Sequence, residues 1–101
     1  MDIFEVEVSL WGKWKRDDTG EVYSFSPGPY PDKKFQDLQE AILQTPDNRA
    51  YLVGFNVFEQ DEKAMLQIVN NVYEIRQMST QSMVLIDGIG KEIFFTPEKK
   101  D

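Results

Sequence analysis

The chain has 101 residues, enough for one domain, and its 18 acidic and 11 basic residues give a net charge of −7. It contains no cysteine and no histidine, which excludes disulfides, thiolate or imidazole metal ligands, and Ser-His or Cys-His catalysis. A hydrophobic fraction of 41% indicates a globular fold rather than disorder. No apolar run approaches the roughly 18 residues of a membrane span, and the acidic N-terminus does not resemble a signal peptide. We therefore expect a cytoplasmic protein that does not bind membranes.

Alternating apolar and polar residues predict a strand over residues 3–15. A turn at residues 17–20, with Gly20 in the left-handed position, then leads into a second strand. This turn pairs Arg16 with Glu21. The resulting register places three aromatic side chains on the face that packs into the core: Trp14, Tyr23 and Phe25.

The opposite face of this hairpin, with the Pro-rich loop that follows it, carries the strongest candidate binding site. Its residues are Trp11, Lys13, Lys15, Arg16 and Tyr30. A tryptophan beside cations is typical of a protein-binding hot spot, and also of the stacking platforms that bind single-stranded nucleic acid. A structural alternative is that Tyr30 and the prolines of residues 27–31 cover Trp11. The nearby carboxylates of Glu5 and Glu7 weaken any attraction for phosphate, which favours a protein partner over a nucleic acid.

Two helices are predicted in the middle of the chain. Asp32 is expected to cap the first, which ends near Gln44, and the second is expected from about Asp61 to Gln77. Between them, residues 50–58 are apolar on both faces, which predicts an interior strand.

A last hairpin is predicted from Ser82–Asp87 and Lys91–Thr96, joined by a turn at residues 88–90. The element order is then ββαβαββ in one domain over residues 1–96, followed by a polar tail over 97–101. Because each helix joins two strands, this order predicts an α+β two-layer sandwich: a five-stranded mixed sheet with both helices on one face. The other face of that sheet would be apolar and uncovered, so we expect a homodimer or a protein partner.

The two remaining motifs are explained better by structural roles than by metal or phosphate binding. Glu59, Asp61 and Glu62 offer oxygen ligands of the kind that Ca²⁺ and Mg²⁺ prefer, but they lack a calcium-loop motif and lie at a predicted helix start. The Gly88-Ile89-Gly90 segment precedes a strand, so it does not match a phosphate-binding fingerprint.

With no catalytic, metal or cofactor site predicted, we expect a non-enzymatic acidic interaction protein: an inhibitor, an immunity-type factor, an adaptor or an accessory subunit. The alternatives are a nucleic-acid binder that uses the Trp11 face and a ligand-sensing domain with a pocket between the helices and the sheet.

Overall fold

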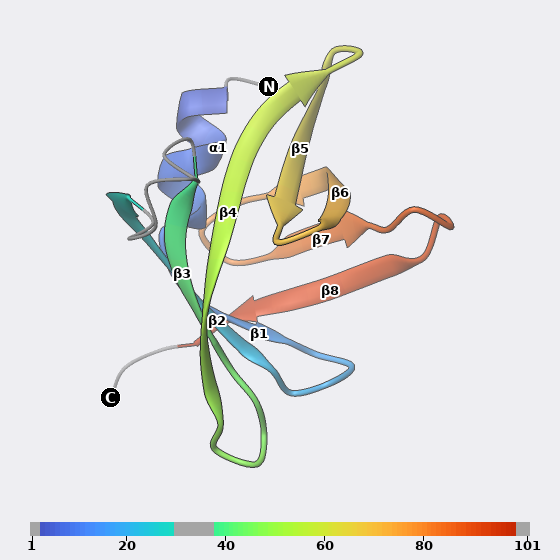
Figure 1. The fold of residues 1–101 in the computed structure, drawn as a ribbon. Helices are drawn as coiled ribbons and strands as arrows, with labels where there is room; N and C mark the ends of the chain where they lie inside the picture. The colour runs from blue at the N-terminus through green and yellow to red at the C-terminus, as the bar shows by residue number, and fades with distance from the viewer. Residues whose placement is uncertain (1–2, 30–37, 99–101) are drawn as a thin grey trace.

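The computed structural model shows a closed barrel of eight antiparallel strands with one short helix at its N-terminus (Figure 1). The structure describes residues 3–29 and 38–98, and side chains over 3–26 and 38–98. The elements are α1 (Ile3–Leu10), β1 (Gly12–Arg16), β2 (Val22–Pro29), β3 (Gln39–Gln44), β4 (Ala50–Gln60), β5 (Lys63–Ile68), β6 (Asn71–Met78), β7 (Met83–Ile86) and β8 (Glu92–Pro97). Each strand pairs with the next in the chain, and β8 pairs with β1 to close the ring. Within the described ranges, no helix is long and apolar enough to cross a membrane.

The predicted α+β two-layer sandwich is therefore wrong. In place of a five-stranded mixed sheet with two helices on one face, all eight strands form one antiparallel ring. The helix predicted to end near Gln44 is β3 over residues 39–44, and residues 32–37 of that prediction lie outside the described residues. The helix predicted over 61–77 is replaced by the β5–β6 hairpin.

The β5–β6 segment carries apolar residues that fit two periods at once. A helix would gather Met65, Ile68 and Val72 on one stripe, whereas β5 buries alternate residues: Ala64, Leu66 and Ile68. A two-residue turn at Val69 and Asn70 reverses the chain, so that Leu66 pairs with Tyr73. The strand pattern prevails because the barrel buries one face of both strands, and because β-branched residues favour strands.

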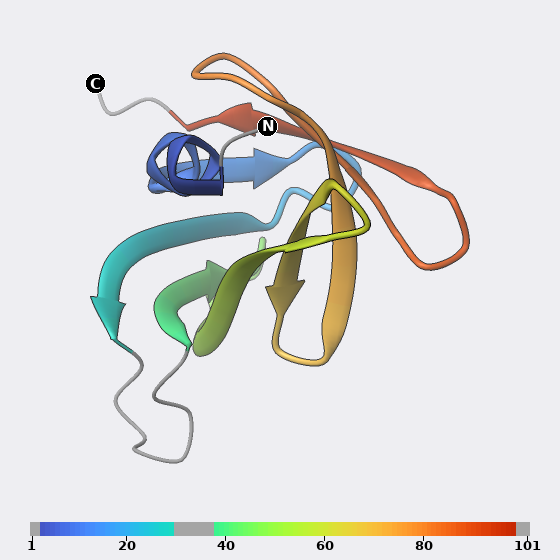
Figure 2. The same ribbon diagram turned by 90° about the horizontal axis from the view of Figure 1, so that it is seen from above.

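The strand predicted over 3–15 is wrong in its first half, which forms α1. The same residues also have helical spacing: Ile3, Val6 and Leu10 share one helix face, and Val6 and Leu10 are buried in the core. Gly12 ends the helical segment with a φ of 122°, a conformation that residues with a side chain rarely adopt. In Figure 2, which views the molecule from above, α1 is seen end-on.

Both predicted hairpins are confirmed. Their observed pairs include Trp14 with Tyr23, Gly12 with Phe25, and Leu85 with Ile93. The turns set these registers: Gly20 has a φ of 78°, and the Asp87 N–H donates to the Lys91 carbonyl at 3.0 Å. The predicted strand over 50–58 is also confirmed, as part of β4, but its interior position holds only for the second half, because residues 50–52 are exposed.

Inward-pointing side chains from the strands and from α1 fill the barrel. At its centre the Phe25 and Phe55 rings meet edge to face with centroids 4.9 Å apart, and Tyr23 stacks on Phe25 at 5.9 Å. An eight-stranded barrel is just wide enough to be filled by side chains or to hold one small ligand. Here side chains fill it, so candidate sites lie outside. The outer face of the ring meets solvent and carries exposed apolar side chains, among them Ile42 and Phe94. The expected homodimer or protein partner therefore stays a prediction.

Val69 offers a test of the turn that produces this topology. Its φ of 56° is unfavourable for a β-branched residue, so Val69→Gly should raise the free energy of unfolding by about 1 kcal/mol. Val72 has a similar exposed fraction, 42% against 47%, but lies within β6. Val72→Gly should lower the free energy of unfolding by about 1 kcal/mol. Urea denaturation of both variants measures the two effects, and a loss of stability in both would contradict this turn geometry.

Candidate functional site

Three large apolar side chains lie exposed on the outer side of α1 and at its end. Phe4, Val8 and Trp11, which we call the helix face, are 68%, 43% and 36% exposed. Their spacing places them on one side of the helix, away from the buried Val6 and Leu10. A surface helix ordinarily has one apolar side and one polar side. Here α1 has a second apolar side that faces solvent.

A hollow of about 340 Å³ borders the helix face where α1 meets β1 and the end of β8. Its lining includes Val8, Trp11, Lys13, Thr80, Pro97 and Glu98. The apolar surface of α1 therefore continues into a concave region, where a side chain of a partner would lose more contact with water than on a flat surface.

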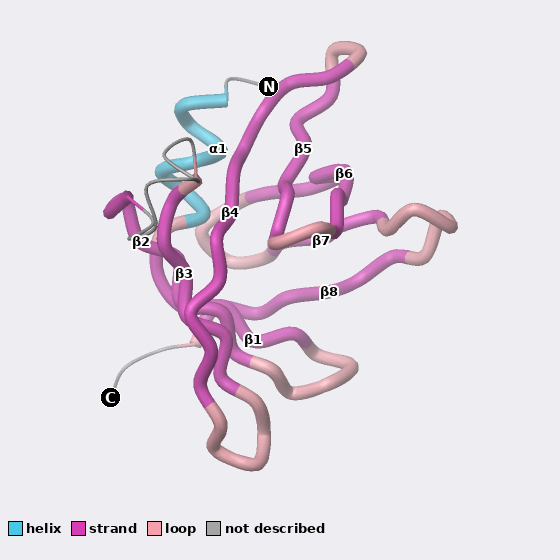
Figure 3. Tube along the Cα trace, viewed as in Figure 1, coloured by secondary structure: helices cyan, strands magenta, loops and turns pink. Residues whose placement is uncertain are grey.

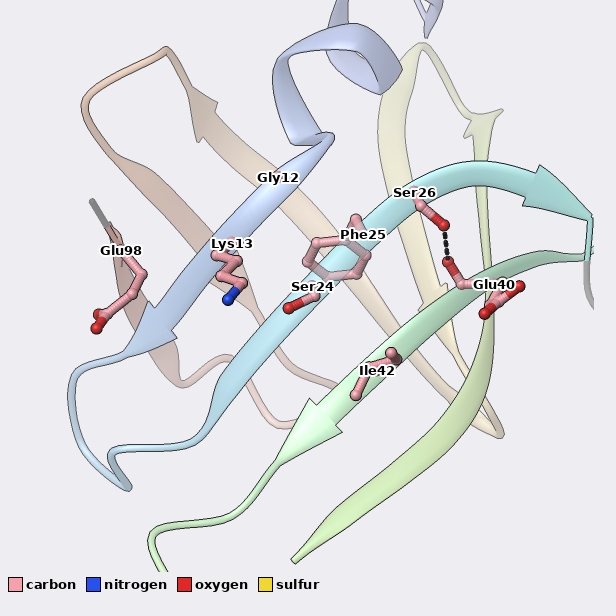
Figure 4. Close-up of a pocket in the computed structure, with 8 residues that line it drawn as sticks. All are labelled: Gly12, Lys13, Ser24, Phe25, Ser26, Glu40, Ile42 and Glu98. Carbon is pink, nitrogen blue, oxygen red and sulfur yellow. Dashed lines mark hydrogen bonds between the residues drawn. The ribbon is translucent and has the colours of Figure 1, made fainter. Parts of the chain in front are cut away.

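A second hollow, of about 430 Å³, lies beyond Lys13 on the outer surface of β1, β2 and β3 (Figure 4). Its lining includes Lys13, Ser24, Ser26, Glu40, Ile42 and Glu98. Gly12 keeps one edge open, because nothing lies within 4 Å of the position that a Cβ would take. The Ser26 hydroxyl donates to the Glu40 carbonyl at 3.1 Å. Lys13 and Glu98 line both hollows, so one cation and one anion lie at the border between them.

The structure brings together only part of the predicted site. Trp11 and Lys13 lie side by side at the first hollow. Lys15 is exposed but lines neither of these two hollows. Arg16 belongs to the opposite end of the barrel, and Tyr30 lies outside the described residues.

Arg16 is held by the β1–β2 turn. Its Nε donates to Asp18 Oδ1 at 2.6 Å and its Nη2 donates to Asp18 Oδ2 at 3.1 Å. This hydrogen bonding raises the pKa of the Arg16 guanidinium and lowers the pKa of the Asp18 carboxyl. The prediction that Arg16 shares the face of Trp11 is therefore wrong. Arg16 follows the core residue Trp14 by two positions, so the two side chains lie on the same side of β1.

Phe4 and Val8 are the site residues that the sequence interpretation missed. In the strand predicted over residues 3–15, both would share one face with Val6 and Leu10. The signal that identifies them is the spacing of Phe4, Val8 and Trp11, which fits one face of a helix, with a glycine just beyond.

The acidic cluster at residues 59–62 also lies in a different secondary-structure element than predicted. Asp61 and Glu62 form the two-residue turn between β4 and β5, with φ values of 53° and 65°, and do not begin a helix. Both values are positive, as in the turn type that matches the twist of a hairpin. Among residues 3–29 and 38–98, no group of three acidic, histidine or cysteine side chains is arranged to hold a metal ion.

Comparisons with models of known protein families, with curated proteins and with solved structures found no match. The function is therefore argued from the geometry of this chain alone.

The two tryptophans give a matched test of the exposed face. Trp14 is 3% exposed, and its Nε1 donates to the Leu10 carbonyl at 2.8 Å. Trp14→Ala should therefore lower the free energy of unfolding by about 3–5 kcal/mol. Trp11→Ala removes a side chain that is 36% exposed, and should cost clearly less, about 1–2 kcal/mol. Urea denaturation followed by circular dichroism measures both. Equal losses would assign Trp11 to the core and remove it from the helix face.

Tyr23 provides a pH test of the core at the other end of the barrel. Burial is the largest influence and raises the pKa of Tyr23 to about 12, although the nearby Arg16 acts in the opposite direction. The pKa of this residue type in the unfolded chain is about 10, so between pH 10 and pH 12 the unfolded state releases its proton first and stability falls as pH rises. Tyr23→Phe lacks this loss. Above about pH 10, the wild type should lose free energy of unfolding relative to this variant by up to about 1.4 kcal/mol per pH unit, as measured by urea denaturation. Parallel pH profiles would contradict a raised pKa.

Proposed function

We propose that this protein is a small, acidic, non-enzymatic interaction module that binds a protein partner through the helix face. The observation that carries the proposal is the exposure of Phe4, Val8 and Trp11 at helical spacing beside two hollows. Exposed apolar groups gathered in one place mark contact sites more often than scattered ones do. Tryptophan in particular contributes much of the binding energy at protein interfaces.

The surroundings of Trp11 indicate the chemistry of the partner. The centre of the site is apolar, and its border carries Lys13 and Glu98. A partner that presents apolar side chains within a rim of both charge signs complements this arrangement. An inhibitor, an immunity-type factor, an adaptor or an accessory subunit would each act in this way. The absence of histidine and cysteine from the sequence supports a role without catalysis.

A single-stranded nucleic acid is a weaker candidate for the same face. Arg16 is paired with Asp18 at the other end of the barrel, so its charge does not join Lys13 beside Trp11. Glu98 lines both hollows with Lys13, and Glu40 lines one of them. These carboxylates offset the positive charge that a phosphate backbone needs, in a chain whose net charge is −7.

Site-specific photo-crosslinking in the source cells tests the proposal. A benzoylphenylalanine in place of Val8 should cross-link to a discrete protein, since Val8 lies on the helix face. The matched control places the same group at Phe94, which is also exposed, at 52%, but lies on β8. Cross-linking from Phe94 alone, or equally from both positions, would contradict the proposal.

The contribution of Trp11 should appear in the affinity for the partner identified in this way. Trp11→Ala is expected to weaken binding about 30-fold or more, as for a hot-spot tryptophan. Lys15→Ala, a change on β1 outside both hollows, should leave the affinity within about threefold. Cross-links to nucleic acid, with an affinity that falls steeply with salt, would favour the alternative function instead.

A further inference from the structure

We propose a second binding site, at the free edge of β4, where an extended segment of another protein adds to the barrel as an extra strand. This site lies on β4 and not on α1, and it is independent of the function proposed for the helix face. Four observations carry it: an unpaired strand edge, the direction of its backbone groups, an apolar groove beside it and the lack of charge among the described residues that line that groove.

The edge arises because β4 is longer than the strand that pairs with it. β4 spans Ala50–Gln60, but β5 pairs with it only from Phe55 to Gln60. One further hydrogen bond, from the Val69 N–H to the Gly54 carbonyl at 2.9 Å, marks the point where the chain turns into β6. Residues 50–53 therefore pair with β3 on one side only. Figure 1 shows this part of β4 continuing past the β5–β6 turn.

The backbone groups of this edge point to the open side. Gly54 directs its carbonyl towards Val69, and successive residues of a strand alternate in direction. Ala50 and Leu52, which are in phase with Gly54, therefore direct their N–H and C=O groups away from β3. Within the described part of the chain, no backbone group pairs with them on that side. An edge of this kind is a template for another strand.

An apolar groove of about 530 Å³ runs along the same edge. Its lining includes Leu38, Tyr51, Leu52, Val53, Val69 and Asn70. Tyr51, Leu52 and Val69 are each between 44% and 47% exposed, so the groove presents large apolar side chains to solvent. The added strand would bury them, in addition to forming backbone hydrogen bonds.

The character of the edge and of the groove identifies the occupant. Backbone donors and acceptors that recur at every second residue match an extended polypeptide, and alternate side chains of that polypeptide would enter the groove. None of the described residues that line the groove is charged, so the entering side chains should be uncharged and of the β-branched type that strands favour. Two copies of this chain, each with a net charge of −7, repel one another, which favours a different partner.

The first test uses a displayed library of short random peptides, selected on the full chain and counter-selected on Leu52→Pro. Proline removes only the N–H that the added strand needs, and it is tolerated at strand edges. Leu52→Ala is the matched control, because it also loses the leucine side chain but keeps the N–H. Enriched peptides should be uncharged and alternating, and should bind Leu52→Pro about tenfold more weakly than Leu52→Ala, the effect of one hydrogen bond. Failure to enrich any such peptide, or equal binding to the two variants, would overturn the proposal.

The second test changes the peptide and does not depend on the folding of Leu52→Pro. N-methylation of the enriched peptide at alternate residues should abolish binding in one phase and preserve it in the other, because only one set of N–H groups faces β4. Equal effects in both phases would overturn the proposal. So would a dimer in sedimentation that Leu52→Pro dissociates, since the occupant would then be a second copy. Trp11→Ala should leave peptide affinity unchanged, which separates this result from any failure at the helix face.

Discussion

The rest of the structure depends on the filling of a closed ring of strands by its own side chains. A barrel has no second layer, so every strand must contribute one apolar face to a single interior. Aromatic rings supply much of that volume, with Phe25 in contact with both Tyr23 and Phe55. The hydrogen bond from Trp14 to the Leu10 carbonyl ties α1 to the same core. The position of α1, and with it the exposure of its second apolar side, follows from this packing.

A filled interior places recognition on the outside of the molecule. Six of the ten exposed large hydrophobic side chains among the described residues lie in two regions: the outer side and end of α1, and the part of β4 beside the β5–β6 turn together with Val69 of that turn. Figure 3 shows why these regions differ, because one is helix and the other is strand next to a turn. The helix offers side chains alone, whereas the strand edge also offers unpaired backbone groups. The first suits a folded partner surface and the second suits an extended segment.

Local signals were reliable at the two hairpin turns that the sequence analysis identified. The Gly20 turn and the Asp87–Lys91 pair lead directly to the observed registers, because a tight turn leaves its flanking residues one pairing. The helix predicted over 61–77 was wrong because apolar residues in segment 63–78 satisfy both helical and strand spacing. The reverse error occurred at residues 3–10, where alternation concealed a helix. In both places the apolar residues fit the helical period and the two-residue strand period nearly equally well, so the local pattern alone does not distinguish a helix from a strand.

The sequence by itself determined the registers of two hairpins and the core character of Trp14, Tyr23 and Phe25. Each of these follows from turn chemistry and from the two-residue period of a strand, which act between near neighbours. Only the tertiary structure decided that the sheet closes, that α1 is a helix and that Val8 and Leu52 face solvent. Closure of the barrel pairs β1 with β8, which lie near opposite ends of the chain. The burial of apolar side chains inside the closed barrel outweighs the local preference of a segment for helix or strand. Long-range packing of this kind selects between local conformations that are nearly equal in free energy.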